Sequence, residues 1–258
     1  MARFAGSDRF HGAEFVDLDM SGAVFRQVDL SGSRFRGVLL TGADIDGVIH
    51  GLTVNGVEVG PLVEAELDRR HPERTRLRPT TAEGMREAWS VVEAFWAPTM
   101  RRARSLTEAD LHRSVDDEWT FTQTLRHLVF VTDAWFGHAV LGRSRPFHPL
   151  GLPPSFITDA AAFGIDPHAD PSFEEVVAVR AGRIAQVGQF LQTGTQEDLD
   201  RAREPNTAPG WPPPAPRTAA SCLHVLFDEE WAHHRFAERD LAVIDARLSA
   251  DATSRFEV

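Results

Sequence analysis

The segment VLFDEEWAHHRFAERDL, residues 225–241, places three carboxylates and two histidines between its two phenylalanines. It contains no glycine or proline, so we expect a helix. At 3.6 residues per turn, Glu230 and His234 fall at the centre of an apolar stripe, side by side and one turn apart. Glu229 and His233 fall towards the edge of that stripe. The pattern predicts that Glu230 and His234 face the protein core.

A carboxylate inside a helical core indicates chemistry, because its buried charge is costly unless a cation or a hydrogen-bond donor compensates it. Glu and His together provide two ligands for a divalent metal, which needs at least a third. The alternative is a hydrogen-bonded Glu–His pair that joins helices without a metal. A third ligand could come from His127 or His138, which both lie on the shoulder of the apolar face of an earlier helix. Periodicity alone does not choose between these two histidines.

Four helical segments are expected to carry these residues. The first begins with a capping box between Thr80 and Glu83, and the third begins with a capping box between Ser172 and Glu175. Pro98 is expected to end or kink the first helix. The second and fourth helices are predicted at residues 120–141 and 219–248.

The connections between these helices are long. The connection at residues 143–171 is long enough to form a lid or a pocket wall. The connection at residues 203–218 is dense in proline, which is expected to exclude regular structure. Four helices with such connections predict a mainly α fold, a four-helix bundle in residues 80–258. A linker, residues 61–79, is expected before it, because residues 69–81 are basic, polar and bounded by prolines.

The first 60 residues carry a repeat of period five. A large apolar residue recurs at every fifth position, with mostly small or aliphatic residues two positions earlier. This period matches neither a helix nor a strand, whereas a square coil with five residues per side would turn these residues inward and stack them. The large residues are Phe10, Phe15, Met20, Phe25, Leu30, Phe35, Leu40 and Ile45.

The run GAEFVDLDMSGAVFRQVDLSGSRFRGVLLTGADI, residues 12–45, resembles the pentapeptide-repeat family. The resemblance implies a right-handed quadrilateral β-helix in residues 1–60, with about four repeats in each coil and about two coils in all. We interpret this segment as a structural cap or scaffold.

Residues 80–250 resemble the DinB-like superfamily, which includes mycothiol-dependent maleylpyruvate isomerases and bacillithiol or mycothiol S-transferases. The resemblance rests on EWTFTQTLRHL, residues 118–128, and on the acid and histidine pattern of the last helix. It implies a divalent metal held by His127 and by a pair that falls on Glu230 and His234. A glutamate here replaces the first histidine of the family's His-x-x-x-His pair, which lowers the charge of the site and could change its metal preference.

The superfamily implies a metal-dependent thiol transferase or isomerase. The metal would bind a low-molecular-weight thiol such as mycothiol and deliver its thiolate to an electrophilic small molecule. Zn²⁺ is the first expectation, with Ni, Fe or Mn as alternatives. We assign no further catalytic or cofactor-binding residue, and we interpret Cys222 as a small buried filler. The alternative function is a non-enzymatic binding or stress-response protein, in which the repeats dock a partner and the bundle is a scaffold.

The composition of the chain limits the classes of partner and site that we expect. A formal charge of −11 disfavours nucleic acid as a partner, and no apolar run is long enough to span a membrane. The single cysteine excludes an internal disulfide and a zinc site built from several cysteines. The first residues lack an apolar signal core, so we expect a cytoplasmic protein. We therefore expect small-molecule partners. The sequence leaves both a monomer and a homodimer as alternatives.

Overall fold

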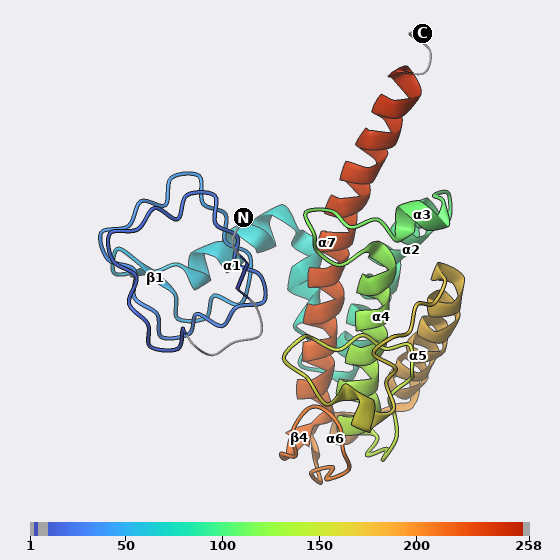
Figure 1. The fold of residues 1–258 in the computed structure, drawn as a ribbon. Coiled ribbons are helices and arrows are strands. Elements are labelled where there is room, and N and C mark those ends of the chain that lie inside the picture. The colour runs from blue at the N-terminus through green and yellow to red at the C-terminus, as the bar shows by residue number, and fades with distance from the viewer. Residues whose placement is uncertain (1–2, 5–9, 255–258) are drawn as a thin grey trace. The chain divides into compact units, whose positions relative to one another are not determined.

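The structure, a computed structural model, describes residues 3–4 and 10–254, with side-chain exposure through residue 250. The chain divides into two compact units, Met1–Asp46 and Gly47–Val258, which are described separately. The first unit is the coiled repeat segment, and the second contains the long helices (Figure 1). Within the described residues, every helix is too short or too polar to cross a membrane.

Regular turns mark the repeat segment. Every ten residues a backbone N–H donates to the carbonyl three residues earlier at 3.0 Å, as Ala13 does to Phe10. The third residue of each such turn is a glycine with φ between 69° and 74°. This left-handed conformation is the one that a type II turn requires, and glycine adopts it without strain. The glycines at these turns are Gly12, Gly22, Gly32 and Gly42.

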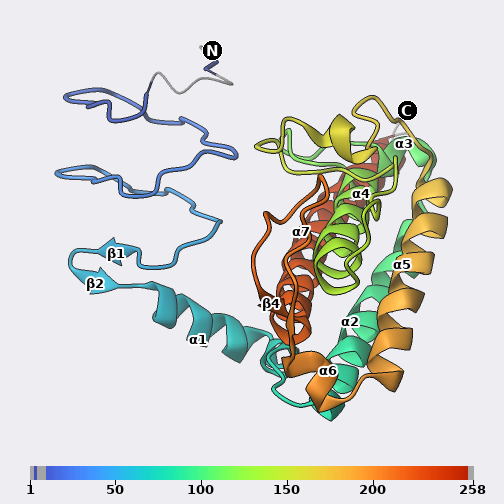
Figure 2. The same ribbon diagram turned by 90° about the horizontal axis from the view of Figure 1, so that it is seen from below.

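Successive coils of the repeat segment lie one above the other in Figure 2. Within residues 10–46, the chain forms these turns but no β-strand. The large side chains of the repeats are also exposed; Phe25, for example, is 57% exposed. The regular turns agree with a winding coil, but the quadrilateral β-helix itself stays a prediction.

The second unit begins with a hairpin and two short helices. β1 (Thr53–Val54) pairs antiparallel with β2 (Val57–Glu58). The two residues between them, Asn55 and Gly56, have φ values of 51° and 81°, as a type I′ turn requires. The α-helix α1 (Gly60–Arg70) and the 3₁₀-helix η1 (Pro72–Leu77) follow. These helices occupy most of the segment expected as a linker. The domain limits given in the sequence analysis stay a prediction.

Four long helices confirm the expected bundle and its mainly α class. They are α2 (Ala82–Ala103), α4 (Phe121–Thr132), α5 (Phe173–Thr193) and α7 (Ala219–Ser254). Figure 2 shows them side by side, and their apolar faces share one hydrophobic core. α4 continues into a π-helix, η2 (Asp133–Val140). The short elements are α3 (Glu108–Leu111), η3 (Ala160–Phe163), α6 (Gln196–Asp200), β3 (Ala202–Arg203) and its antiparallel partner β4 (Arg217–Thr218).

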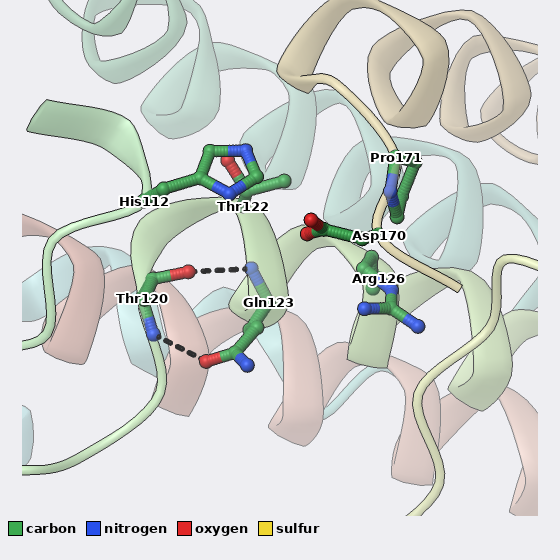
Figure 3. A pocket seen from close by; sticks show the side chains of 7 residues that line it. All are labelled: His112, Thr120, Thr122, Gln123, Arg126, Asp170 and Pro171. Carbon is green, nitrogen blue, oxygen red and sulfur yellow. Dashed lines mark hydrogen bonds between the residues drawn. The ribbon is translucent and has the colours of Figure 1, made fainter. Parts of the chain in front are cut away.

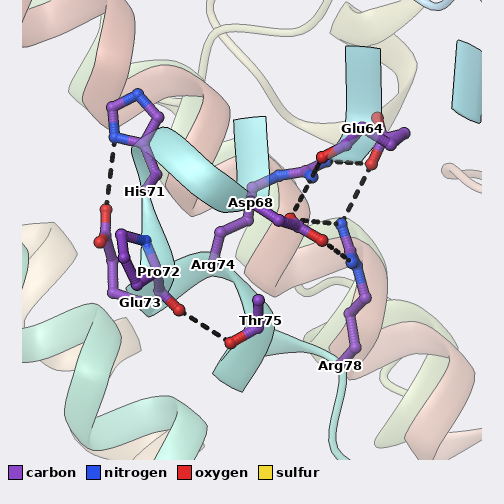
Figure 4. A network of polar contacts seen from close by, with 8 residues as sticks. All are labelled: Glu64, Asp68, His71, Pro72, Glu73, Arg74, Thr75 and Arg78. Atoms are coloured by element: carbon purple, nitrogen blue, oxygen red, sulfur yellow. Dashed lines mark hydrogen bonds and ion pairs between the residues drawn. The ribbon is translucent and has the colours of Figure 1, made fainter. Parts of the chain in front are cut away.

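An ion-pair network ties α1 to η1 (Figure 4). Arg74 contacts Glu64 at 2.5 Å and Asp68 at 2.7 Å, and Arg78 contacts the same two carboxylates at 3.0 and 2.8 Å. The Arg74 guanidinium also lies over the ring of Trp231 on α7, 4.8 Å from its centroid. The network therefore connects the two short helices to the bundle.

Capping boxes fix the beginnings of α4 and α5. The backbone N–H of Gln123 donates to Thr120 Oγ1 at 3.2 Å, and the N–H of Thr120 donates to Gln123 Oε1 at 2.9 Å. The expected box between Ser172 and Glu175 is confirmed. Both boxes satisfy N–H groups that have no partner within the helix.

The beginning of α2 differs from the expectation by one residue. Its N-cap is Thr81, whose Oγ1 accepts from the N–H of Gly84 at 3.0 Å, so the predicted cap at Thr80 was wrong. Glu83 then lies at the second helical position, one residue too early to close a capping box. Pro98 lies inside α2, which continues beyond it.

Candidate metal centre

Three side chains with metal-binding atoms meet between α4 and α7. His127 comes from α4, and Glu229 and His233 lie one turn apart on α7, with their ligand atoms within 4.8 Å of one another. Glu229 Oε2 is 3.2 Å from His233 Nε2 and 3.6 Å from His127 Nε2. Bonds of about 2.1 Å to one tetrahedral ion would separate two ligand atoms by about 3.4 Å. Both separations therefore fit a shared divalent ion.

A hydrogen bond outside the cluster orients His127. Its Nδ1 lies 2.9 Å from the carbonyl oxygen of Leu152. Because a carbonyl only accepts, Nδ1 carries a proton, which leaves Nε2, the atom that faces Glu229, as the nitrogen that can bind a metal. Histidine ligands of metals are commonly held in this way.

The charges of the cluster suit a cation. Burial alone would raise the pKa of Glu229, but the contacts with His127 and His233 outweigh burial and hold that pKa at about 2. Burial lowers the pKa of His233, with Glu229 acting in the opposite direction. At neutral pH the pair on α7 is therefore a carboxylate and a neutral imidazole, the forms that bind a metal.

Aromatic rings surround the two imidazoles. The Trp119 ring lies 4.7 Å from the ring of His127 and stacks on His233 at 6.0 Å. Phe130 contacts His127, and Phe236 meets His233 edge-on at 5.7 Å. These rings replace water around the two imidazoles, and a drier environment strengthens electrostatic attraction to a cation.

The structure places Glu230 outside this cluster. Its two carboxylate oxygens accept from Nη1 and Nη2 of Arg180 on α5, at 3.0 and 2.6 Å. Glu230 is 1% exposed and Arg180 is 4% exposed. The inward direction of Glu230 is as expected, but a bidentate arginine compensates its charge, so the carboxylate needs no metal.

The structure also places His234 elsewhere. Its Nε2 lies 2.8 Å from Oγ1 of Thr99 on α2, and Thr99 donates to Glu238 Oε1 at 2.5 Å. Its ring packs against Phe95, with centroids 4.6 Å apart. The predicted set of His127, Glu230 and His234 is therefore not brought together.

The reason is that α2 and α4 both pack against α7 but contact different residues of it. Neighbouring residues of a helix lie about 100° apart around its axis. Glu230 and His234 face α5 and α2, whereas Glu229 and His233 face α4. Both pairs have the same spacing of four residues, so the sequence alone does not show which pair faces His127.

His138, the other candidate on the second predicted helix, lies in η2 and is buried. Its Nδ1 lies 3.0 Å from the side-chain nitrogen of Asn206, and its ring contacts Phe147. It is not among the residues of the cluster. Its contacts are those of a residue that joins η2 to the loop before α7.

A polar cavity of about 220 Å³ lies at the beginning of α4 (Figure 3). In Figure 3 the carboxylate of Asp170 points towards Thr122 and His112. The three candidate ligands do not line this cavity, so it is separate from the cluster. Its lining residues are His112, Thr120, Thr122, Gln123, Arg126, Asp170 and Pro171.

The comparison with known families agrees with this architecture. A model of the DinB superfamily matches residues 91–237, more than half of the chain and all three cluster residues, and the chain belongs to that superfamily. Eight copies of pentapeptide repeats match in residues 9–48. No curated protein and no solved structure matches the chain. Both family resemblances expected from the sequence are confirmed.

Proposed function

We propose that this protein binds one divalent metal ion through His127, Glu229 and His233 and uses it in thiol chemistry. The observation that carries the proposal is the spacing of the three donors, with two imidazole nitrogens 3.2 and 3.6 Å from one carboxylate oxygen. Membership of the DinB superfamily supports a metal-dependent, thiol-related activity. The set shares His127 with the one expected from the sequence and shifts the pair on α7 by one residue.

The residues of the cluster have separate tasks in this function. The carbonyl of Leu152 fixes the ring of His127, and Trp119 covers both imidazoles and excludes water. Three protein ligands leave coordination positions open for a substrate. When bound, the metal would lower the pKa of a low-molecular-weight thiol, whose thiolate attacks an electrophilic small molecule.

Glu229 distinguishes this site from a set of three histidines. Its negative charge lowers the net charge of the loaded site by one unit, and two histidines with one carboxylate suit zinc and also several transition metals. We propose Zn²⁺ first, with Ni, Fe or Mn as alternatives. A thiol of the mycothiol type and a cytoplasmic location complete the proposal.

A thiol-conjugation assay tests the activity. The protein is stripped with a chelator, reloaded with Zn²⁺ and incubated with cysteine or mycothiol and a chloronitrobenzene electrophile. We expect turnover in the wild type and in His234→Ala, and loss of turnover in His233→Ala. Of the two neighbouring histidines, only His233 belongs to the cluster. Turnover that survives in His233→Ala contradicts the proposal. Metal binding without consumption of any thiol rejects the enzymatic part and favours a non-enzymatic binding role.

A further inference from the structure

The loop of residues 148–152 connects the candidate metal centre with Arg126, the neighbour of His127 on α4. The N–H of Leu152 donates to the carbonyl of Arg126 at 3.1 Å. The Nε–H of Arg126 in turn donates to the carbonyl of Leu150 at 2.9 Å. The side chain of Arg126 therefore binds Leu150, and its backbone carbonyl binds Leu152. These two contacts lie on either side of Gly151, next to the Leu152 carbonyl that binds His127.

Gly151 lets this loop lie close to α4. A Cβ atom at this position would lie 3.2 Å from the carbonyl oxygen of His148 and 3.5 Å from Cβ of Phe130. The first separation is tighter than ordinary van der Waals contact, so a larger residue would press the loop away from the helix. The close approach brings the Leu152 carbonyl within reach of His127.

A second anchor holds the beginning of the loop. The N–H of His148 donates to Oδ2 of Asp133 at 2.8 Å, and Nε of Arg183 on α5 donates to Oδ1 of the same carboxylate at 2.8 Å. Asp133 is 5% exposed. With both ends held by buried charged groups, the loop has little freedom to shift along α4.

Arg126 is itself buried, with 6% exposure. Burial lowers its pKa, and Asp170 and Asp166 act in the opposite direction. Figure 3 shows Arg126 and Asp170 beside the polar cavity. Burying a guanidinium is costly, and a charged donor makes a stronger hydrogen bond to a carbonyl than a neutral one does. A buried arginine is thus well suited to fix a loop that must not move.

We propose that Arg126 is a positioning residue of the metal centre. By holding the Leu150 carbonyl with its side chain, beside the Leu152 N–H that its backbone carbonyl binds, Arg126 keeps the Leu152 carbonyl at His127 Nδ1 and so presents His127 Nε2 to the metal. The inference rests on the proposed function, because it takes His127 as a metal ligand. It assigns to Arg126 a role that acts through the loop and not through contact with the ion.

The affinity of the full-length protein for Zn²⁺, measured by titration, tests the proposal. Arg126→Met keeps much of the side-chain volume but removes the donor, and we expect it to weaken binding by about 10- to 100-fold, as for other residues that orient a metal ligand. Arg126→Lys keeps a donor and is expected to restore part of the affinity. Leu125→Ala is the control, because Leu125 is buried on α4 about 160° from His127, so that its truncation lowers stability on another face of the helix. Equal affinities in Arg126→Met and the wild type overturn the proposal, as does equal weakening in Leu125→Ala.

The tautomer of His127 in the metal-free protein provides a readout that needs no metal. We expect ¹⁵N NMR to show a proton on Nδ1 in the wild type and in Leu125→Ala, and a mixture of tautomers in Arg126→Met. An unchanged tautomer in Arg126→Met overturns the positioning role. If the wild type binds no Zn²⁺, the proposed function fails, but the tautomer still decides the role of Arg126. If Arg126→Met does not fold, Arg126→Leu, which also removes the donor, takes its place, and wild-type affinity and tautomer in that variant overturn the proposal.

Discussion

Glu229 and Glu230 are neighbours in the sequence, but their partners give them different roles. Glu230 is 1% exposed and is bound by Arg180 through two hydrogen bonds. The side chain of Glu229 is 35% exposed and contacts His127 and His233. The charge of Glu230 is already compensated, whereas the partners of Glu229 are groups that a metal would also bind.

Replacing Glu230 tests the structural role of the buried pair. Glu230→Gln leaves the guanidinium of Arg180 buried without its carboxylate, and we expect the free energy of unfolding to fall by about 3–5 kcal/mol. Urea denaturation of the metal-free protein measures this loss. Glu238→Gln, on the same helix with a side chain 42% exposed, is the control and should cost at most about 1 kcal/mol. Similar losses in both variants would contradict the role of the buried pair.

The stability of the metal-free protein should depend on pH through the cluster. Burial lowers the pKa of His233, so the unfolded chain binds this proton first and stability falls as the pH drops below about 6.5. Glu229 has a pKa of about 2 in the folded protein. That value lies below the unfolded pKa of about 4.3, so stability falls further as the pH drops from about 4.3 to about 2.

Thermal unfolding from pH 7 down to pH 3, with chelator present, measures both effects. We expect Glu229→Gln to show a weaker dependence than the wild type below about pH 4.3, because glutamine does not titrate and only the other carboxylates still contribute. Identical profiles for the wild type and Glu229→Gln would rule out the assigned ionisation of Glu229.

At the scale of elements, α7 shows which features of the site helical periodicity predicts and which it does not. Periodicity predicts the inward stripe of α7, and Glu230 is indeed buried on it. It also predicts a helix that carries His127, which α4 confirms. It does not predict from which direction α4 approaches, and that direction selects Glu229 and His233. The change from α4 to a π-helix at Asp133 is likewise absent from the pattern, since apolar spacing does not record a change of hydrogen-bond register.

The cap of α4 gives a prediction at this scale. Thr120→Ala removes the acceptor for the N–H of Gln123, and we expect a loss of about 1 kcal/mol in the free energy of unfolding. The affinity for Zn²⁺ should change little, because Leu152 still holds His127. Urea denaturation and metal titration measure the two quantities. Thr193→Ala, whose hydroxyl binds a carbonyl within α5, is the control with a smaller expected loss. Weakened metal binding without a loss of stability in Thr120→Ala would contradict this separation.

For the whole molecule, the two compact units predict that the bundle folds without the repeats. A chain that begins at Gly47 keeps α1, η1 and their ion pairs. A chain that begins at Thr80, the start of the bundle expected from the sequence, loses Leu77, which is 2% exposed in the core. Burial of a leucine contributes about 1.5–3 kcal/mol, so the shorter chain should unfold at lower urea concentration.

The longer truncated chain should bind Zn²⁺ as tightly as the full-length protein. Equal stability of the two truncated chains would show that η1 does not belong to the bundle. Loss of metal binding in the chain that begins at Gly47 would contradict the independence of the second unit.

The repeats show a similar limit of sequence reasoning. The period of five identifies the family, and the turns at Gly12, Gly22, Gly32 and Gly42 recur at twice that period. The inward ladders were also expected, but Phe25 and the other large residues are exposed. A ladder needs a coil above and below each residue, and eight repeats supply too few coils to cover their own ends.

The metal content of purified protein tests the central claim most directly. Wild type, His233→Ala and His234→Ala are loaded with Zn²⁺, desalted and measured by mass spectrometry of the metal. The account predicts about one zinc ion per chain in the wild type and in His234→Ala, and none in His233→Ala, because His233 and not His234 lies with His127 and Glu229. A metal-free wild type, or zinc retained by His233→Ala and lost by His234→Ala, would contradict it.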